Sequence, residues 1–233
     1  MILKILTSLF ALGLVVIVLR VVQLFAQTVK EYHWLPSIVA IFISVWLVYL
    51  SVLSHFQTLT DTGFPPRIPV FVVLPLLIIL GILLFQAGSG TFVDMLSIKW
   101  LIYFQSFRII VEVIIWGAYQ KGMLPMETTF EGYNFDIAVG ISAVPLATFA
   151  DRIKMKKTVF LIWNVISLII LANTVRVFIG SIYYPVMFGH EYTLVGPDFF
   201  KLPYLFIPGL FLPLAVYVHA FSIKQLVRLR DDE

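Results

Sequence analysis

The sequence contains no cysteine and little charge. Without cysteine, the chain forms no disulfides, thiolate metal sites or cysteine nucleophiles. Charged residues make up 12% of the 233 residues and hydrophobic residues 61%, whereas a soluble domain is about one quarter charged. The formal net charge of +3 is small for this length and gives no case for nucleic-acid binding. The composition therefore indicates a membrane-integral protein.

Common catalytic and cofactor motifs are also absent. The sequence has no G-x-S-x-G, no P-loop and no dinucleotide fingerprint. Its four histidines, none in an H-E-x-x-H pattern, are too widely spaced for a local zinc site. No lysine lies inside the apolar run nearest the C-terminus, which argues against a retinal Schiff base. These absences leave no motif that fixes a reaction.

Seven apolar runs approach the length of about 20 residues that a membrane helix needs. They are Ile5–Ala26, Trp34–His55, Ile68–Gln86, Lys99–Tyr119, Asp136–Ala150, Val159–Gly180 and Tyr204–Ile223. No loop between them is long enough to form a second domain. We therefore expect a single membrane domain over residues 1–233, an all-α polytopic bundle of about seven transmembrane helices.

The run Asp136–Ala150 is short and contains Gly140 and Pro145. Short or interrupted membrane segments expose backbone groups at depth and often mark binding sites in transporters. Alternatively, a tilted or half-exposed helix simply needs fewer residues. Asp136 begins the run, and its charge suits a helix N-terminus.

Basic residues predict the orientation. With seven crossings, one side holds Lys30, Lys99, Arg152, Lys154, Lys156, Lys157, Lys224, Arg228 and Arg230. The other side holds Lys4, Arg67, Lys121 and Lys201. Because cytoplasmic loops carry the excess of lysine and arginine, we expect the N-terminus outside and the C-terminus in the cytoplasm.

A polar stripe crosses the fourth run. Gln105, Arg108 and Glu112 are spaced i, i+3 and i+7, which places them within roughly 60° of one another on a helix. A guanidinium at bilayer depth costs at least about 2.5–3.5 kcal/mol. Arg108 should therefore face the protein interior and be paired, with Glu112 as the nearest candidate partner.

Two interpretations of the stripe stay open. In the first, the arginine and glutamate form a buried pair that fixes how helices dock. In the second, Arg108 holds a small anionic or carbonyl-bearing ligand, Gln105 orients it, and Glu112 sets the charge balance or carries a proton. Spacing alone does not separate them.

The outer loops add candidate entrance residues. Glu131, Asn134 and Asp136 would form or gate a vestibule that leads to the stripe, and Asn173 and Arg176, one turn apart, could line it. The alternative is an aromatic belt with solvated acids, since Trp and Tyr favour that depth.

Three functions are compatible with these features. The leading hypothesis is a small-solute binding membrane protein, a transporter or sensor, whose polar intramembrane site opens to the outer side. The second is a membrane-embedded metal-dependent enzyme that uses His190 and His219 with nearby acids. The third is a non-catalytic assembly subunit of a membrane complex, in which the buried pair is structural.

The stripe and the segment that follows it carry a family resemblance. The Q-x-x-R-x-x-x-E helix, followed by T-F-E-G-x-N-F-D at 129–136, is similar to an uncharacterised family of bacterial polytopic membrane proteins. The resemblance attaches no activity and implies a bacterial inner membrane. The helix count also resembles that of the ceramidase and adiponectin-receptor-like hydrolases, but their paired histidines are missing around His219.

Overall fold

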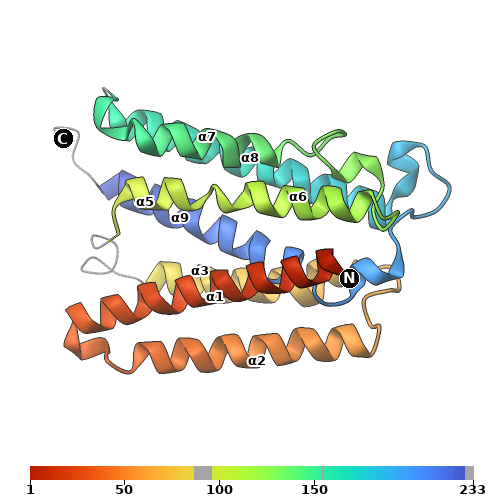
Figure 1. Cartoon of the computed structure of the whole chain (residues 1–233), viewed down its shortest axis with the longest axis horizontal. Coiled ribbons are helices and arrows are strands. Elements are labelled where there is room, and N and C mark those ends of the chain that lie inside the picture. The colour runs from red at the N-terminus through yellow and green to blue at the C-terminus, as the bar shows by residue number, and fades with distance from the viewer. Residues whose placement is uncertain (87–95, 154, 229–233) are drawn as a thin grey trace.

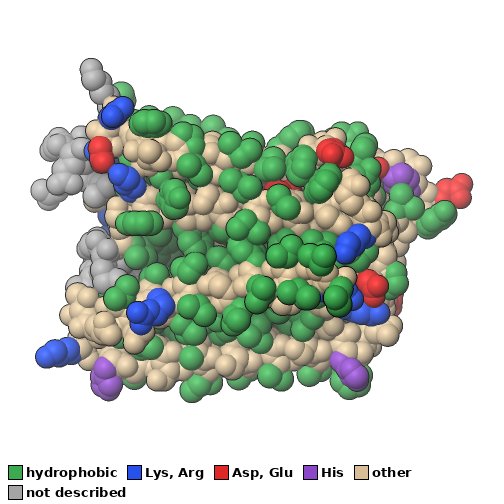
Figure 2. Space-filling view, in the orientation of Figure 1, with side chains coloured by type: hydrophobic (Ala, Val, Ile, Leu, Met, Phe, Trp, Pro, Cys, Tyr) green, Lys and Arg blue, Asp and Glu red, His purple; other side chains and the backbone are tan. Residues whose placement is uncertain are grey.

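The computed structural model describes residues 1–86, 96–153 and 155–228, and these ranges contain helices and no strand. The helices are α1 (Ile2–Thr28), α2 (Leu35–His55), α3 (Leu74–Gln86), α5 (Ile98–Phe104), α6 (Phe107–Tyr119), α7 (Asp136–Thr148), α8 (Lys156–Tyr183) and α9 (Leu212–Arg228). They lie side by side along the long axis (Figure 1). Apolar side chains cover the middle of the visible face and charged ones gather toward its ends (Figure 2).

Six helical stretches are long and apolar enough to cross a membrane. They are Ile2–Thr28, Lys30–His55, Ile68–Phe85, Ile98–Tyr119, Lys156–Tyr183 and Ile207–Arg228. Six of the seven predicted runs correspond to these stretches, which confirms the predicted all-α membrane bundle. The other run forms α7, whose 13 residues rise only about 20 Å, less than the hydrocarbon thickness of about 30 Å.

A segment over residues 125–135, in which the one regular element is the 3-10 turn Met126–Thr128, leads into α7. Its backbone groups are bonded within the protein: Tyr133 N–H donates to the Glu127 carbonyl, and Asn134 N–H to the Thr129 carbonyl. Gly132 is required here, because a Cβ would lie 2.5 Å from the Met126 carbonyl oxygen. Irregular backbone is tolerated at membrane depth only when it is satisfied in this way.

The helix predicted over Lys99–Tyr119 is divided at Gln105 and Ser106 into α5 and α6. Around this point four backbone N–H groups donate to carbonyls three positions back, and these donors belong to Gln105, Ser106, Arg108 and Ile109. Such a tightened turn interrupts the α-helix without a proline. The division lies next to Arg108.

Two proline-containing helices pack against each other near the centre of the bundle. Each begins with a π-helical turn, Ile68–Val73 before α3 and Ile207–Phe211 before α9. The two turns are in contact. Because Pro75 and Pro213 lack an N–H, the carbonyls of Phe71 and Gly209, four residues earlier, lose their usual helical donors.

Helix α2 supplies the missing donors for both carbonyls. Tyr49 Oη donates to the Phe71 carbonyl at 2.9 Å, and Trp46 Nε1 donates to the Gly209 carbonyl at 2.7 Å. The two aromatic residues are three positions apart and therefore share one face of α2. One helix thus satisfies both proline-freed carbonyls, and this fixes how α2, α3 and α9 meet.

Basic residues predicted to be cytoplasmic gather at the end of the bundle where α5 and α8 begin. Lys99 Nζ lies 3.2 Å from Asp151 Oδ2, and Lys156 Nζ lies 3.8 Å from Asp151 Oδ1. The hydrogen bond from Lys99 and the two ammonium charges hold the pKa of Asp151 below its usual range. Lys154 and Arg230 of the predicted set lie outside the described residues.

Candidate functional site

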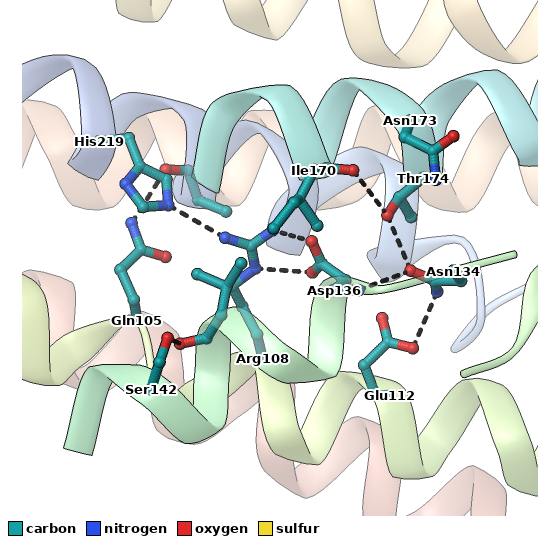
Figure 3. Close-up of polar contacts among 12 residues, drawn as sticks. Gln105, Arg108, Glu112, Asn134, Asp136, Ser142, Ile170, Asn173, Thr174 and His219 are labelled. Carbon is teal, nitrogen blue, oxygen red and sulfur yellow. Dashed lines mark hydrogen bonds and ion pairs between the residues drawn. The ribbon is translucent and has the colours of Figure 1, made fainter. Parts of the chain in front are cut away.

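Arg108, the second residue of α6, is buried at the centre of a polar network (Figure 3). Its Nε donates to Asp136 Oδ2 at 2.6 Å, and its Nη2 forms an ion pair with Asp136 Oδ1. The guanidinium and the carboxylate therefore meet as a two-point pair, the strong form of this interaction. Both side chains are nearly inaccessible, with exposed fractions of 1% and 6%.

The position of α7 explains why Arg108 pairs with Asp136. We expected Glu112 as the partner because it lies one turn away on the same helix. Asp136 instead reaches Arg108 from the first residue of α7, which packs so closely on α6 that a Cβ on Gly140 would lie 2.9 Å from Ile109 N. Residue spacing along one helix cannot reveal this contact, because it joins two different helices.

His219 of α9 extends the network from the other side of the guanidinium. Arg108 Nη1 lies 3.0 Å from His219 Nε2, and His219 Nδ1 lies 2.8 Å from Asn164 Oδ1. Because a guanidinium only donates, Nε2 accepts and Nδ1 carries the proton that it donates to Asn164. Asn164 Nδ2 in turn donates to the Phe160 carbonyl. The imidazole is thus neutral and its tautomer is fixed.

Glu112 belongs to a second branch that is organised by Asn134. Asn134 Nδ2 donates to Glu112 Oε2 at 2.8 Å and to the Thr128 carbonyl at 3.0 Å. Asn134 Oδ1 accepts from the backbone N–H of Asp136 and from the hydroxyl of Thr174. Glu112 Oε1, in contrast, is buried and has no hydrogen-bond partner among the described residues.

Gln105 lies at the turn between α5 and α6. Its Nε2 donates to the Ala215 carbonyl of α9 at 3.2 Å, and its Oε1 is buried without a hydrogen-bond partner in the described part of the chain. Five of the residues selected from the sequence are therefore buried in one region, together with the alternative residue His219. The five are Gln105, Arg108, Glu112, Asn134 and Asp136.

The other selected residues lie away from this network. Glu131 Oε1 accepts from the indole N–H of Trp116. Asn173 Nδ2 donates to the Tyr133 carbonyl, and Asn173 Oδ1 accepts from the exposed Arg176. Asn173 therefore connects α8 to the segment that leads into α7, and Arg176 bonds Asn173 within α8.

His190 is also separate from His219. Its Nε2 lies 2.8 Å from Glu127 Oε1. In residues 1–86, 96–153 and 155–228, no three His, Cys, Asp or Glu side chains are grouped so that they could hold a metal ion.

Sequence reasoning did not select Asn164, Thr128 and Thr174 as site residues. Each is at least nine-tenths buried and bonds to a member of the network or supports one. A polar side chain in the middle of the 28-residue apolar helix α8 was a usable signal for Asn164 and Thr174. Thr128 gave no such signal, because it lies in a loop-like segment where threonine is common.

An apolar cavity of about 90 Å³ lies against the network. Arg108, Glu112, Asp136 and Thr174 form its polar wall, and Tyr183 is the remaining polar residue that lines it. The cavity continues between α6, α8 and the two π-helical turns, toward the end of the bundle where α8 terminates. Its other walls are aliphatic and aromatic, so the cavity has a hydrocarbon-like interior that lies against one buried cluster of ionisable side chains.

Fold and composition together define a multi-pass α-helical membrane protein. Comparison with protein-family models, with curated proteins and with solved structures finds no match for the chain. The functional argument therefore depends on the network and the cavity themselves.

Proposed function

We propose that the protein binds a small molecule within the membrane bundle, as a transporter or a sensor. The observation that carries this proposal is the apolar cavity against the buried pair of Arg108 and Asp136. Ligand sites are typically apolar pockets with a few convergent polar groups, and ionisable residues inside a membrane bundle mark functional sites more often than other positions do.

The selected residues have two roles: some line the cavity, and others hold the lining residues in place. Arg108, Glu112 and Asp136 line the cavity, whereas Asn134 fixes Glu112 and the start of α7. Gln105 acts from outside the cavity, through its bond to Ala215. Glu131, Asn173 and Arg176 would act nearer the entrance. The expectation that Arg108 itself holds an anion is less favoured, because its guanidinium already bonds Asp136 and His219.

The proposed topology has seven crossings, with α7 and its lead-in segment as the fifth. The N-terminus would be outside and the C-terminus in the cytoplasm. In support, the start of α1 and the end of α9 lie at opposite ends of the bundle (Figure 1). Leu3 in α1 approaches Gly117 near the end of α6, whereas Lys224 near the end of α9 donates to the Leu84 carbonyl near the end of α3. The cavity then extends toward the outer side. A bacterial inner membrane stays a prediction from the family resemblance.

Native mass spectrometry of the purified protein tests the binding proposal. Val175 lines the cavity from α8 and is partly exposed, so Val175→Trp fills the space with little strain on the core. Ile169→Trp is the matched control, because Ile169 lies on the same helix with 64% of its surface exposed. We expect a co-purified small molecule in the wild type and in Ile169→Trp that is reduced in Val175→Trp. Identical ligand-free masses for all three proteins would contradict the proposal.

A second function is favoured by the completeness of the arginine network. Arg108 bonds on three of its nitrogens within the chain, as expected of a pair that fixes helix docking. In this case the protein is a non-catalytic subunit of a membrane complex. The double substitution described in the Discussion separates the two functions, because a purely structural pair is replaceable by apolar side chains.

A further inference from the structure

The carboxyl of Glu112 has unused hydrogen-bonding capacity at the cavity. Asn134 donates to Oε2, and Oε1 has no partner among the described residues. The side chain is 99% buried, since its exposed fraction is 1%, and it lines the cavity. In the ionised form of Glu112, this buried oxygen without a donor would cost about 1–3 kcal/mol or more. A ligand that donates a hydrogen bond at this point would remove that cost.

The charges around the cavity are unbalanced. Among the described residues, the charged side chains that line it are Arg108, Glu112 and Asp136, one cation and two carboxyls. Arg108 is committed to Asp136 through two nitrogens and to His219 through a third. The second carboxyl, that of Glu112, therefore lacks a direct cationic partner. When Glu112 is ionised, the wall favours a ligand with positive charge and disfavours an anion.

The rest of the cavity wall is apolar and suits a hydrocarbon chain. From Glu112 the wall continues over Val111, Ile179 and Phe211, and the next polar residue is Tyr183 at the end of α8. The Tyr183 hydroxyl already accepts from the Ile68 N–H at 2.9 Å. A ligand with a second strongly polar group between Glu112 and Tyr183 would leave that group unsatisfied along this wall. One polar head and an apolar body fit the available partners.

From this geometry we infer that the site takes a lipophilic amine: an apolar chain whose protonated amino group donates to Glu112 Oε1 while its hydrocarbon part fills the cavity. This inference rests on the proposed function and specifies its ligand class. Asn134 and Thr174 then act as positioning residues, because they hold the glutamate and the start of α7 in place.

Equilibrium binding to the full chain in nanodiscs of zwitterionic lipid tests the inference. The probes are octylamine, octanol and octanoate, which share a chain and differ in the head group. Empty nanodiscs give the background from partitioning into the bilayer. We expect the wild type to bind octylamine at least tenfold more tightly than octanol, and to bind octanoate most weakly.

Glu112→Gln is the informative variant, because it keeps an acceptor for Asn134 and removes the charge. It should bind octylamine no more tightly than octanol. Glu131→Gln is the matched control, since Glu131 is exposed and bonds Trp116 away from the cavity, and it should behave as the wild type. If Glu112→Gln does not fold, the wild type still tests the ligand class through its ranking of the three probes. Val175→Trp then tests whether the cavity is the place where they bind.

The outcomes separate the ligand class from binding itself. Octanol or octanoate bound as tightly as octylamine by the wild type would overturn the amine inference, and would leave the cavity as a binding site. No binding of any probe above empty nanodiscs, or equal binding by the wild type and Val175→Trp, would overturn both the inference and the proposed function. Octylamine binding that Glu112→Gln retains in full would overturn the assigned role of Glu112.

Discussion

Arg108 is buried with partners from α7 and α9, and this burial has a measurable cost. Arg108→Met leaves the carboxylate of Asp136 inside the bundle without its cation, so we expect a loss of about 3–5 kcal/mol in the free energy of unfolding. Asp136→Leu should cost a similar amount for the converse reason. Reversible unfolding in mixed micelles measures both changes.

The double variant Arg108→Met with Asp136→Leu should recover most of this loss, because apolar side chains can replace a buried pair at little cost. Recovery of stability together with loss of the co-purified ligand would favour the binding function. Recovery with normal assembly into a larger complex would favour the structural subunit. A double variant as unstable as the sum of the single ones would contradict the pairing described here.

At the residue scale, the sequence was informative about burial and less so about partners. The stripe of Gln105, Arg108 and Glu112 was predictable, because helical spacing is local and an arginine cannot face lipid cheaply. The pairing with Asp136 was not, since it depends on where α7 begins, 28 residues along the chain. His219 was named as a ligand of the alternative metal site, and its contact with Arg108 could not be derived from the sequence.

The lead-in to α7 makes a prediction at the scale of one element. A Cβ on Gly132 would meet the Met126 carbonyl oxygen at 2.5 Å and Glu127 Cα at 2.6 Å, both backbone atoms. Gly132→Ala should therefore displace the segment and lower the unfolding free energy, on the order of 1–3 kcal/mol as for other overpacked sites. Thermal unfolding by circular dichroism measures the effect.

Gly81→Ala is the control for this substitution, because a Cβ there meets nothing within 4 Å. Alanine is favoured over glycine in a helix by up to about 1 kcal/mol, so the control should be neutral or slightly stabilising. Equal destabilisation by the two substitutions would argue against the tight packing of the lead-in segment.

Helix α2 carries a second element-scale prediction. Trp46→Phe keeps most of the ring and removes the N–H that bonds the Gly209 carbonyl. Because Pro213 cannot supply the missing donor, the carbonyl stays unsatisfied, and we expect a loss of about 1–3 kcal/mol. Trp100→Phe, at a position 68% exposed, should change stability little. The same unfolding assay compares the two variants.

Element boundaries were predictable to within one residue for α2, whose run is mainly apolar, and to within three residues for α8. The division at Gln105 and Ser106 was not, because neither residue is a strong helix breaker and the tightened turn becomes visible only through its backbone bonds. The short run at Asp136 was recognised as unusual, but the ordered segment before it could not be derived from composition.

At the scale of the whole molecule, the predicted orientation can be measured. The chain has no cysteine, so a single introduced thiol has no background. Lys30 and Lys121 are exposed and follow the ends of α1 and α6, which lie at opposite ends of the bundle (Figure 1). In intact cells, a membrane-impermeant maleimide should label Lys121→Cys and not Lys30→Cys, because lysine-rich connections stay in the cytoplasm. Disrupted cells should show both labelled. The reverse pattern in intact cells would invert the orientation.

The bonds from α2 to the proline-freed carbonyls also have a consequence for biosynthesis. Tyr49 meets its acceptor 22 residues later in the chain, whereas the acceptor of Trp46 is 163 residues away. A ribosome that adds about 5–20 residues per second delivers Phe71 almost at once and Gly209 many seconds later. During that interval the indole N–H of Trp46 lacks its native acceptor, so we expect α2 and α3 to join early in insertion and α9 to complete the assembly.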